Sequence, residues 1–206
     1  MWGKPEMSHP LQCRCGTLKG YLSNPQTANH CACYCKDCRA FAHFLGRANE
    51  ILDEHGGTHV IQTVPANVTF TDGLQSLACM RLSERGLLRW YTTCCNTPVG
   101  NTLANYRVSF VSLVHSCLEI TGKSLDDSFG PVRMYVNTKS AEGTVKSSSI
   151  ASISVILRFI VTLARARIDG SYKRTPFFSI RAGAGTPVVI PRVLSRSERD
   201  QLPGGR

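Results

Sequence analysis

Residues 30–39 read His30-Cys31-Ala32-Cys33-Tyr34-Cys35-Lys36-Asp37-Cys38-Arg39, with four cysteines among ten residues. Thiolate is the softest ligand that a protein offers, and zinc is the metal that most often binds it. So dense a run of cysteines is poorly suited to a core element, and we expect a loop whose sulfur atoms converge on one ion. The stretch therefore predicts a metal site.

Cys33, Cys35 and Cys38 form a Cys-x-Cys-x-x-Cys set inside this stretch. Three protein ligands that leave a fourth position for water or substrate are typical of catalytic zinc, which makes these cysteines candidate catalytic ligands. The alternative is a closed structural site, with Cys31 or a remote residue as the fourth ligand. Ligand spacing alone favours the closed site, because four-cysteine sites are common.

Two further cysteine pairs, Cys13/Cys15 and Cys94/Cys95, lie upstream and downstream of the run. Cysteines separated by one residue are poorly placed to bridge each other, yet both can reach one ion. Cys13 and Cys15 would need a remote pair to complete a structural site, and Cys94 and Cys95 are available. We expect this pair to complete the site. Because adjacent cysteines chelate one ion awkwardly, a site with only three sulfurs is the alternative, with Cys95 the better candidate of the pair.

Length and cysteine content limit the class of protein. The chain has 206 residues, 42% of them hydrophobic, enough for one core and a small appended part. Residues 1–7 contain no apolar segment of the kind that directs secretion, so we expect a cytoplasmic protein whose cysteines are thiols and metal ligands. Cys79 and Cys117 lie in apolar runs and are expected to be buried, unreactive thiols.

Charge is distributed unevenly along the chain. The formal net charge is +10, and residues 158–206 hold ten basic side chains against three acidic ones. A basic segment of this kind can bind nucleic acid, anionic lipid or an anionic small molecule. The simplest interpretation is a solvated face that keeps the protein in solution.

Short β-rich runs alternate with turn signals from residue 11 to residue 116, which predicts a mainly β fold. The expected strands cover residues 18–22, 58–64, 67–71, 74–82, 87–93 and 108–114. A turn is predicted at Thr71-Asp72-Gly73, and a short helix at residues 39–45.

The C-terminal part has a different pattern. Residues 117–147 are polar and are expected to be a linker, and residues 148–206 form an extension with an apolar helix. This helix is expected to begin near Ile150, after a cap at residues 147–149, and to end near Arg167. Ile153, Ile156, Leu157 and Ile160 recur in it at helical spacing.

The apolar helix is too short for a membrane span, which needs about 20 apolar residues, and Arg158 interrupts it. We expect it to pack on the β domain. The alternative is a helix that lies in a membrane interface, with basic side chains on the lipid headgroups. Those side chains would be Arg165, Arg167, Lys173 and Arg174. A last short helix is predicted by the capping-box spacing of Ser195 and Glu198.

Three ordered motifs carry a resemblance to a known family. They are Cys13 to Gly16, Cys33 to Cys38, and Arg89-Trp90-Tyr91 followed by Cys95-Asn96-Thr97-Pro98. In this order they resemble the glutathione-dependent formaldehyde-activating enzymes, a family also named for centromere protein V. The resemblance covers roughly residues 11–116, and it leaves the C-terminal part, with Phe177, outside the core domain.

The resemblance implies a β-rich, Mss4-like domain at residues 11–116 that binds two zinc ions. Cys13 and Cys15 would hold a structural zinc with the late cysteines, and Cys33, Cys35 and Cys38 would hold a catalytic one. The family usually places a cysteine three residues before the one matched by Cys95, where this chain has Thr92. It also has Asn96 where the family has glycine. The fourth ligand of the structural zinc therefore stays open.

The resemblance also implies an activity. The founding enzyme is a carbon–sulfur lyase that joins formaldehyde and glutathione into S-hydroxymethylglutathione. Lys36 and Arg39 are candidates to hold the carboxylates of such a thiol, although a solvated loop charge is the simpler interpretation of each. His30 and His43 flank the run as candidate fourth ligands or proton carriers.

Two other classes of function stay open. One is a zinc-stabilised binding module without catalysis, associated with nucleic acid through the basic tail. The other is a redox protein that uses the Cys35-Lys36-Asp37-Cys38 spacing. No strand–helix pattern of the thioredoxin type surrounds that spacing, so metal binding is favoured.

Overall fold

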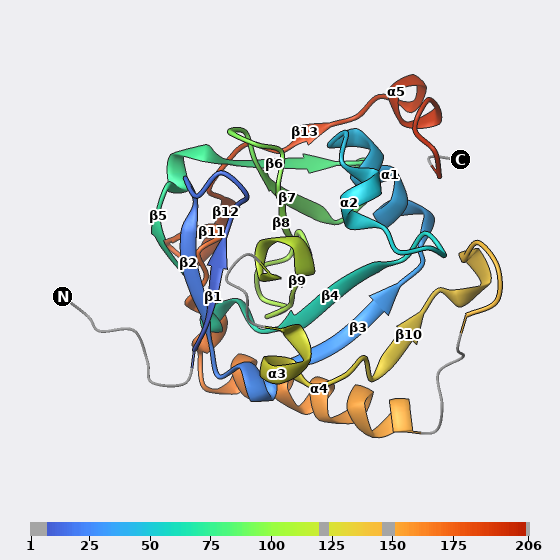
Figure 1. The fold of residues 1–206 in the computed structure, drawn as a ribbon. Helices are drawn as coiled ribbons and strands as arrows, with labels where there is room; N and C mark the ends of the chain where they lie inside the picture. Colours follow the sequence, from blue (N-terminus) through green and yellow to red (C-terminus); the bar gives the residue numbers. More distant parts are fainter. Residues whose placement is uncertain (1–7, 120–123, 146–150, 205–206) are drawn as a thin grey trace.

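A computed structural model describes residues 8–119, 124–145 and 151–204, whose arrangement is shown in Figure 1. An eight-stranded sheet runs through the molecule in the order β10-β3-β4-β9-β8-β7-β6-β13. These strands are β3 (Asn29–Cys33), β4 (Thr58–Thr63), β6 (Leu77–Arg81), β7 (Leu88–Thr92), β8 (Pro98–Thr102), β9 (Val111–Val114), β10 (Met134–Val136) and β13 (Arg192–Val193). All pairs are antiparallel except the two edge pairs, β10 with β3 and β13 with β6.

Two smaller sheets complete the β structure. One has the order β1-β2-β5, with β1 (Ser8–Gln12), β2 (Lys19–Ser23) and β5 (Val68–Asp72). The other is the hairpin of β11 (Phe178–Arg181) and β12 (Ala184–Pro187). The helices are α1 (Lys36–Phe44), α2 (Ala48–Ile51), α3 (Leu125–Phe129), α4 (Ala151–Ile168) and α5 (Arg196–Asp200). The prediction of a mainly β fold is confirmed.

Most of the expected strands form where the β-rich runs predicted them. Two begin later than expected: a 3-10 turn, η3 (Leu74–Ser76), precedes β6, and β9 begins only at Val111. The predicted turn is present at Gly73, which has a φ of +72°. A Cβ atom there would lie 2.1 Å from the carbonyl oxygen of Thr17, so the position requires glycine.

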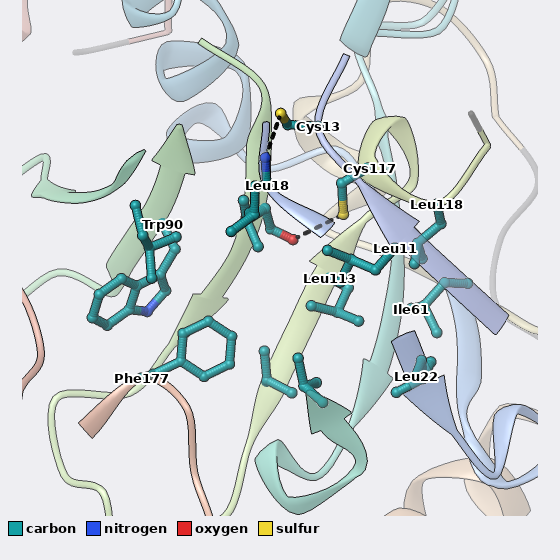
Figure 2. Packing of buried hydrophobic residues seen from close by; sticks show 14 of the residues in the cluster. Leu11, Cys13, Leu18, Leu22, Ile61, Trp90, Leu113, Cys117, Leu118 and Phe177 are labelled. Atoms are coloured by element: carbon teal, nitrogen blue, oxygen red, sulfur yellow. Dashed lines mark hydrogen bonds between the residues drawn. The ribbon is translucent and has the colours of Figure 1, made fainter. Parts of the chain in front are cut away.

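The main core lies around Trp90 (Figure 2), whose indole N–H donates to Oγ1 of Thr102 at 2.9 Å. Phe177 is fully buried there, with its ring centroid 5.2 Å from that of Trp90. The distant C-terminal segment thus returns to the β structure and covers the ring of Trp90 with Phe177. Cys79 and Cys117 are buried, as predicted.

The C-terminal helices agree in part with those predicted from the sequence. The capping box of α5 is confirmed, since Ser195 and Glu198 each bind the backbone N–H of the other. The expected cap and start of α4 at residues 147–150 lie outside the described residues. Helix α4 touches the molecule through a face that includes Phe159 and Ala166, and Phe159 packs edge-on against Phe110 at 5.9 Å.

The expectation that α4 packs on the β domain holds for the face with Phe159 and Ala166. The apolar side chains of Ile153, Ile156, Leu157 and Ile160 are nevertheless exposed. No helix in the described ranges is long and apolar enough to cross a membrane. The division into a domain at residues 11–116, a linker at 117–147 and an extension at 148–206 stays a prediction.

Candidate metal centres

A strand, a tight turn and a helix hold the three-cysteine cluster, defined as Cys33, Cys35 and Cys38. Cys33 ends β3, Cys35 is the N-cap of α1, and Cys38 lies in the first turn of that helix. The expectation of a loop is wrong for most of the run, because His30 to Cys33 belong to β3 in the large sheet and α1 begins at Lys36. The cap brings the N–H of Cys38 to 3.3 Å from Sγ of Cys35, and Sγ of Cys38 lies 3.8 Å from Sγ of Cys33. All three sulfur atoms lie within 4.8 Å of one another.

The neighbouring candidates for a fourth ligand point elsewhere. Cys31 is buried and packs with Val60 and Met134. The ring of His30 is held by the carbonyl oxygen of Gly130 at 2.9 Å and by Nδ1 of His59 at 3.2 Å. Among the described histidines, cysteines and acidic residues, none joins the three sulfurs within the 4.8 Å that defines the cluster.

The three-cysteine cluster lines a pocket of about 420 Å³. Apolar side chains form part of its wall: Val60, Leu87, Phe110 and Val136. Polar side chains form the rest: Lys36, Asp37, Gln62, Arg89, Asn101, Ser112, Asn137 and Ser140. A larger hollow of about 870 Å³ lies between the β6–β7 turn and α5, and its described lining contains no cysteine. The smaller pocket is therefore the one that combines metal ligands with room for a small molecule.

Arg89 on β7 is the buried cation of this pocket. Its Nη1 donates to Oδ1 of Asn101 at 3.1 Å and lies 3.9 Å from Sγ of Cys38. Its Nη2 lies 3.8 Å from Oδ2 of Asp37, which also pairs with Arg199 at 3.2 Å. The guanidinium packs over the ring of Phe41 at 5.4 Å. A buried guanidinium needs nearby negative charge, and the sulfur atoms are placed to supply it.

The thiols of the cluster differ in their proton affinity. Hydrogen bonds from Cys33 and Cys35 hold the pKa of Cys38 well below its ordinary value, and the Arg89 guanidinium acts in the same direction. Hydrogen bonds to Cys33 and Cys38 raise the pKa of Cys35. Without a metal the cluster thus retains protons, which a divalent cation would displace. Three thiolates and Zn²⁺ carry one net negative charge, which Arg89 balances, so the donor set fits zinc.

The four-cysteine cluster consists of Cys13, Cys15, Cys94 and Cys95. Cys13 and Cys15 follow β1, and Cys94 and Cys95 lie in the turn between β7 and β8. Sγ of Cys94 lies 3.3 Å from that of Cys15 and 3.8 Å from that of Cys13. All four sulfur atoms lie within 4.8 Å of one another, so the cluster could hold an ion with four sulfurs as well as with three. A four-sulfur set without a further position is typical of structural zinc.

The turn at residues 92–97 places Thr92 and Asn96 next to Cys95. Asn96 has a φ of +52°, a left-handed conformation that asparagine tolerates better than most residues. Oγ1 of Thr92 accepts from the N–H of Thr97 at 3.2 Å and lies 3.4 Å from Sγ of Cys95. Burial acts to raise the pKa of Cys95, but hydrogen bonds from Thr92 and Thr97 outweigh it and lower this pKa to about 5.

The two basic candidates of the run are placed differently. Lys36 lines the pocket. Arg39 donates to the carbonyl oxygen of Ser140 at 2.8 Å and pairs with Glu142 at 3.0 Å. Sequence reasoning missed the roles of Arg89 and Asn101, which lie on neighbouring strands far along the chain from the cysteine run. The only signal for Arg89 was its place in the Arg-Trp-Tyr motif.

Comparisons with known proteins give a family but no activity. The sequence model of DUF6151, described as a family of unknown function, matches residues 6–189. No curated protein matches the chain. Among solved structures, a crystal structure of a Rhodobacter sphaeroides protein from a structural-genomics programme is similar, with 16% identity and a TM-score of 0.38. That match covers 60% of this chain and 96% of the other.

Proposed function

The chain belongs to the DUF6151 family, and we propose from its own residues that it is a zinc-dependent carbon–sulfur lyase. It would make or break the bond between a small thiol and the carbon of a small aldehyde. One observation carries the proposal: three cysteines, joined by no fourth histidine, cysteine or acidic ligand among the residues that the structure describes, line a pocket of about 420 Å³ beside a buried arginine. A closed structural site would show a fourth ligand, as the four-cysteine cluster does.

Cys33, Cys35 and Cys38 would hold the catalytic zinc, and the four-cysteine cluster would hold a structural one. When bound at an open site, zinc supplies a Lewis acid that lowers the pKa of a thiol or polarises a carbonyl. The reducing cytoplasm that the sequence predicts would keep both clusters as thiols.

The chemistry requires stabilisation of negative charge. The substrate thiol loses its proton, its sulfur lone pair forms the carbon–sulfur bond, the carbonyl electron pair moves to oxygen, and this oxygen takes up a proton. Arg89 is the group on the chain that would stabilise the thiolate and the developing alkoxide. Its orientation is fixed by Asn101, which in turn donates to Oγ of Ser112 at 3.3 Å. Because the orientation of the guanidinium is already fixed, it does not have to turn when negative charge develops on the substrate.

A thiol of the glutathione type suits the pocket. Its carboxylates would be held by Lys36 at the rim, and its amides by polar side chains such as Gln62 and Asn137. The apolar wall, which includes Phe110 and Val136, would exclude water from the reacting sulfur. Arg39 would act indirectly, because it holds Ser140 at the edge of the pocket.

The test is metal content by elemental mass spectrometry together with exchange NMR of the thiol–aldehyde adduct. The substrates are glutathione and formaldehyde, which react slowly without a catalyst. We expect two zinc ions per chain and faster exchange with the protein. Cys35→Ser should lose one zinc ion and the acceleration, and the control Cys79→Ala should keep both.

Two outcomes would overturn the proposal. One is a single zinc ion that survives Cys35→Ser, because the three-cysteine cluster would then hold no metal. The other is two zinc ions without any acceleration of exchange. That result would favour a zinc-stabilised binding module, and nucleic-acid affinity that falls steeply with salt would then be the measurement to make.

A further inference from the structure

Helix α4 lies on the outside of the molecule (Figure 1). Several of its large apolar side chains are exposed. We define the outer face of α4 by its exposed apolar residues: Ile153, Ile156, Leu157, Ile160, Val161 and Ile168. Leu157 is 61% exposed and Ile168 86% exposed, and such side chains are normally buried. A helix that is apolar on its outer face as well as on its packed face is expected to bury the outer face against a binding partner.

The surroundings of this face are strongly basic. Residues 151–181 contain six basic side chains against one acidic side chain, Asp169. Arg158 and Arg165 are exposed and follow the outer face along one flank, since they lie two turns apart on the helix. Arg167 lies with its guanidinium carbon 4.6 Å from the ring centroid of Tyr172. Basic side chains thus lie beside the apolar ones along the C-terminal half of the helix.

A pocket of about 370 Å³ lies on the same flank, between α4 and the β structure. We name it the arginine pocket, after Arg158, Arg165 and Arg174 in its wall. Asn67 and Ser171 add polar groups to the wall, and Asp169 adds one carboxylate against the three arginines. Three guanidinium groups around one hollow are suited to bind the oxygens of a phosphoryl group.

We propose that the outer face of α4 is a docking surface for an anionic lipid bilayer. The apolar side chains would enter the boundary between headgroups and acyl chains, with the helix axis parallel to the membrane plane. The arginine pocket, beside this face, would receive a lipid phosphate. Apolar residues on one side of a helix with arginines along its flank are the pattern of interfacial helices.

Charge decides between a lipid bilayer and a second copy of the chain. Two such faces brought together would oppose arginine to arginine across a low-dielectric contact, which disfavours self-association. An anionic bilayer offers apolar chains and negative headgroups in one surface, and it complements both features. This inference does not depend on the lyase proposal.

The test is flotation of the full chain with vesicles of phosphatidylcholine, alone or mixed with phosphatidylserine. We expect binding only to the mixed vesicles and release by salt. Arg158→Gln/Arg165→Gln should weaken binding about thirtyfold, because each basic residue near such a surface contributes about 1 kcal/mol. Leu157→Gln/Ile160→Gln should weaken it by at least about tenfold.

Matched controls are available on other surfaces. Leu74→Gln changes an apolar side chain that is 47% exposed on η3, and Arg85→Gln/Arg196→Gln removes two exposed charges at the larger hollow. Both controls should bind vesicles as the unchanged protein does. All variants should retain the zinc content of the parent, which shows that they fold.

Three results would overturn the inference. The first is equal binding to neutral and anionic vesicles, or none to either. The second is binding of inorganic phosphate in the arginine pocket, lost in Arg158→Gln/Arg165→Gln, without vesicle binding. The third is a dimer in light scattering that becomes a monomer in Leu157→Gln/Ile160→Gln, again without vesicle binding.

Discussion

The sulfur atom of Cys35 accepts a hydrogen bond from the backbone N–H of Cys38 at 3.3 Å, so the N-cap of α1 is itself a candidate metal ligand. A helix N-terminus presents unpaired N–H groups and a partial positive charge, both of which favour thiolate over thiol. The start of the helix and the three-cysteine cluster therefore share one side chain, and substitutions can separate its two roles.

Serine and alanine at position 35 should have different effects on stability. Both variants lose a sulfur and should lose one zinc ion per chain. Serine still caps a helix, whereas loss of the cap costs about 1 kcal/mol, so Cys35→Ala should be less stable than Cys35→Ser by about that amount. Urea denaturation of the two variants measures the difference, and equal midpoints would show that the cap contributes nothing.

Arg89 should affect turnover more than folding. Arg89→Gln removes the charge beside Cys38, and we expect the exchange rate of the adduct to fall about 10²- to 10³-fold. Asp37 would keep Arg199 as a partner, so no buried carboxylate is left unpaired. Arg89→Lys should restore part of the rate, because it keeps the charge but not the guanidinium fork.

The control for Arg89 is Arg81→Gln on β6, which removes an arginine outside the pocket. Zinc content should remain at two ions in each of these variants. An unchanged exchange rate in Arg89→Gln would remove Arg89 from the mechanism and leave the metal site intact.

The four-cysteine cluster permits a rescue experiment. Cys94→Ser should lose the structural zinc and several kcal/mol of stability, because metal binding at such sites contributes directly to folding. Thr92→Cys in the same chain would restore four sulfurs with the spacing of the resembling family. Since Oγ1 of Thr92 lies 3.4 Å from Sγ of Cys95, we expect the double variant to regain the zinc ion. Thr92→Ser with Cys94→Ser is the control and should not regain it.

Acid should destabilise the protein through His59. Burial, with His115 and His30 nearby, lowers the pKa of His59 below its ordinary value of 6.5, whereas Asp53 and Glu119 oppose this shift. Below that ordinary value the unfolded chain binds a proton that the folded chain does not, so the free energy of unfolding falls as pH falls.

Denaturant titrations between neutral pH and about pH 5 measure this effect. His59→Gln should flatten the decline, and His55→Gln, outside this histidine group, should leave it as it is. If the free energy of unfolding falls with pH equally in the parent and in His59→Gln, other groups cause the acid sensitivity.

The sequence predicted the elements whose pattern is local. The runs of β4 and β7 alternate or carry aromatic and branched residues over five or six positions, which is enough to identify a strand. Edge strands β10 and β13 have only three and two residues and pair through backbone groups, so no side-chain pattern marks them. The face of α4 that packs could not be identified either, because apolar residues surround the helix and only the tertiary structure selects one side.

The sequence predicted the cysteine ligands of the candidate site but not the residues that surround them. Cysteine spacing identified the members of both clusters, since cysteines one or two residues apart can reach one ion, although the pairing of Cys13 and Cys15 with the distant Cys94 and Cys95 depends on the fold. Arg89 and Asn101 approach Cys38 only because β7 and β8 pair in register, with Arg89 opposite Asn101. Cys94 and Cys95 are adjacent, yet in the turn with the left-handed Asn96 both sulfur atoms lie within 4.8 Å of those of Cys13 and Cys15.

Phe110 lines the three-cysteine pocket and also contacts Phe159 on the packed face of α4. One aromatic ring thus separates the three-cysteine pocket from helix α4. A displacement of Phe159 would remove a contact from Phe110, so these two rings couple the position of α4 to the wall of the pocket. If the outer face of α4 docks on a bilayer and the pocket binds the thiol, as proposed, docking would then change the fit of the thiol in the pocket.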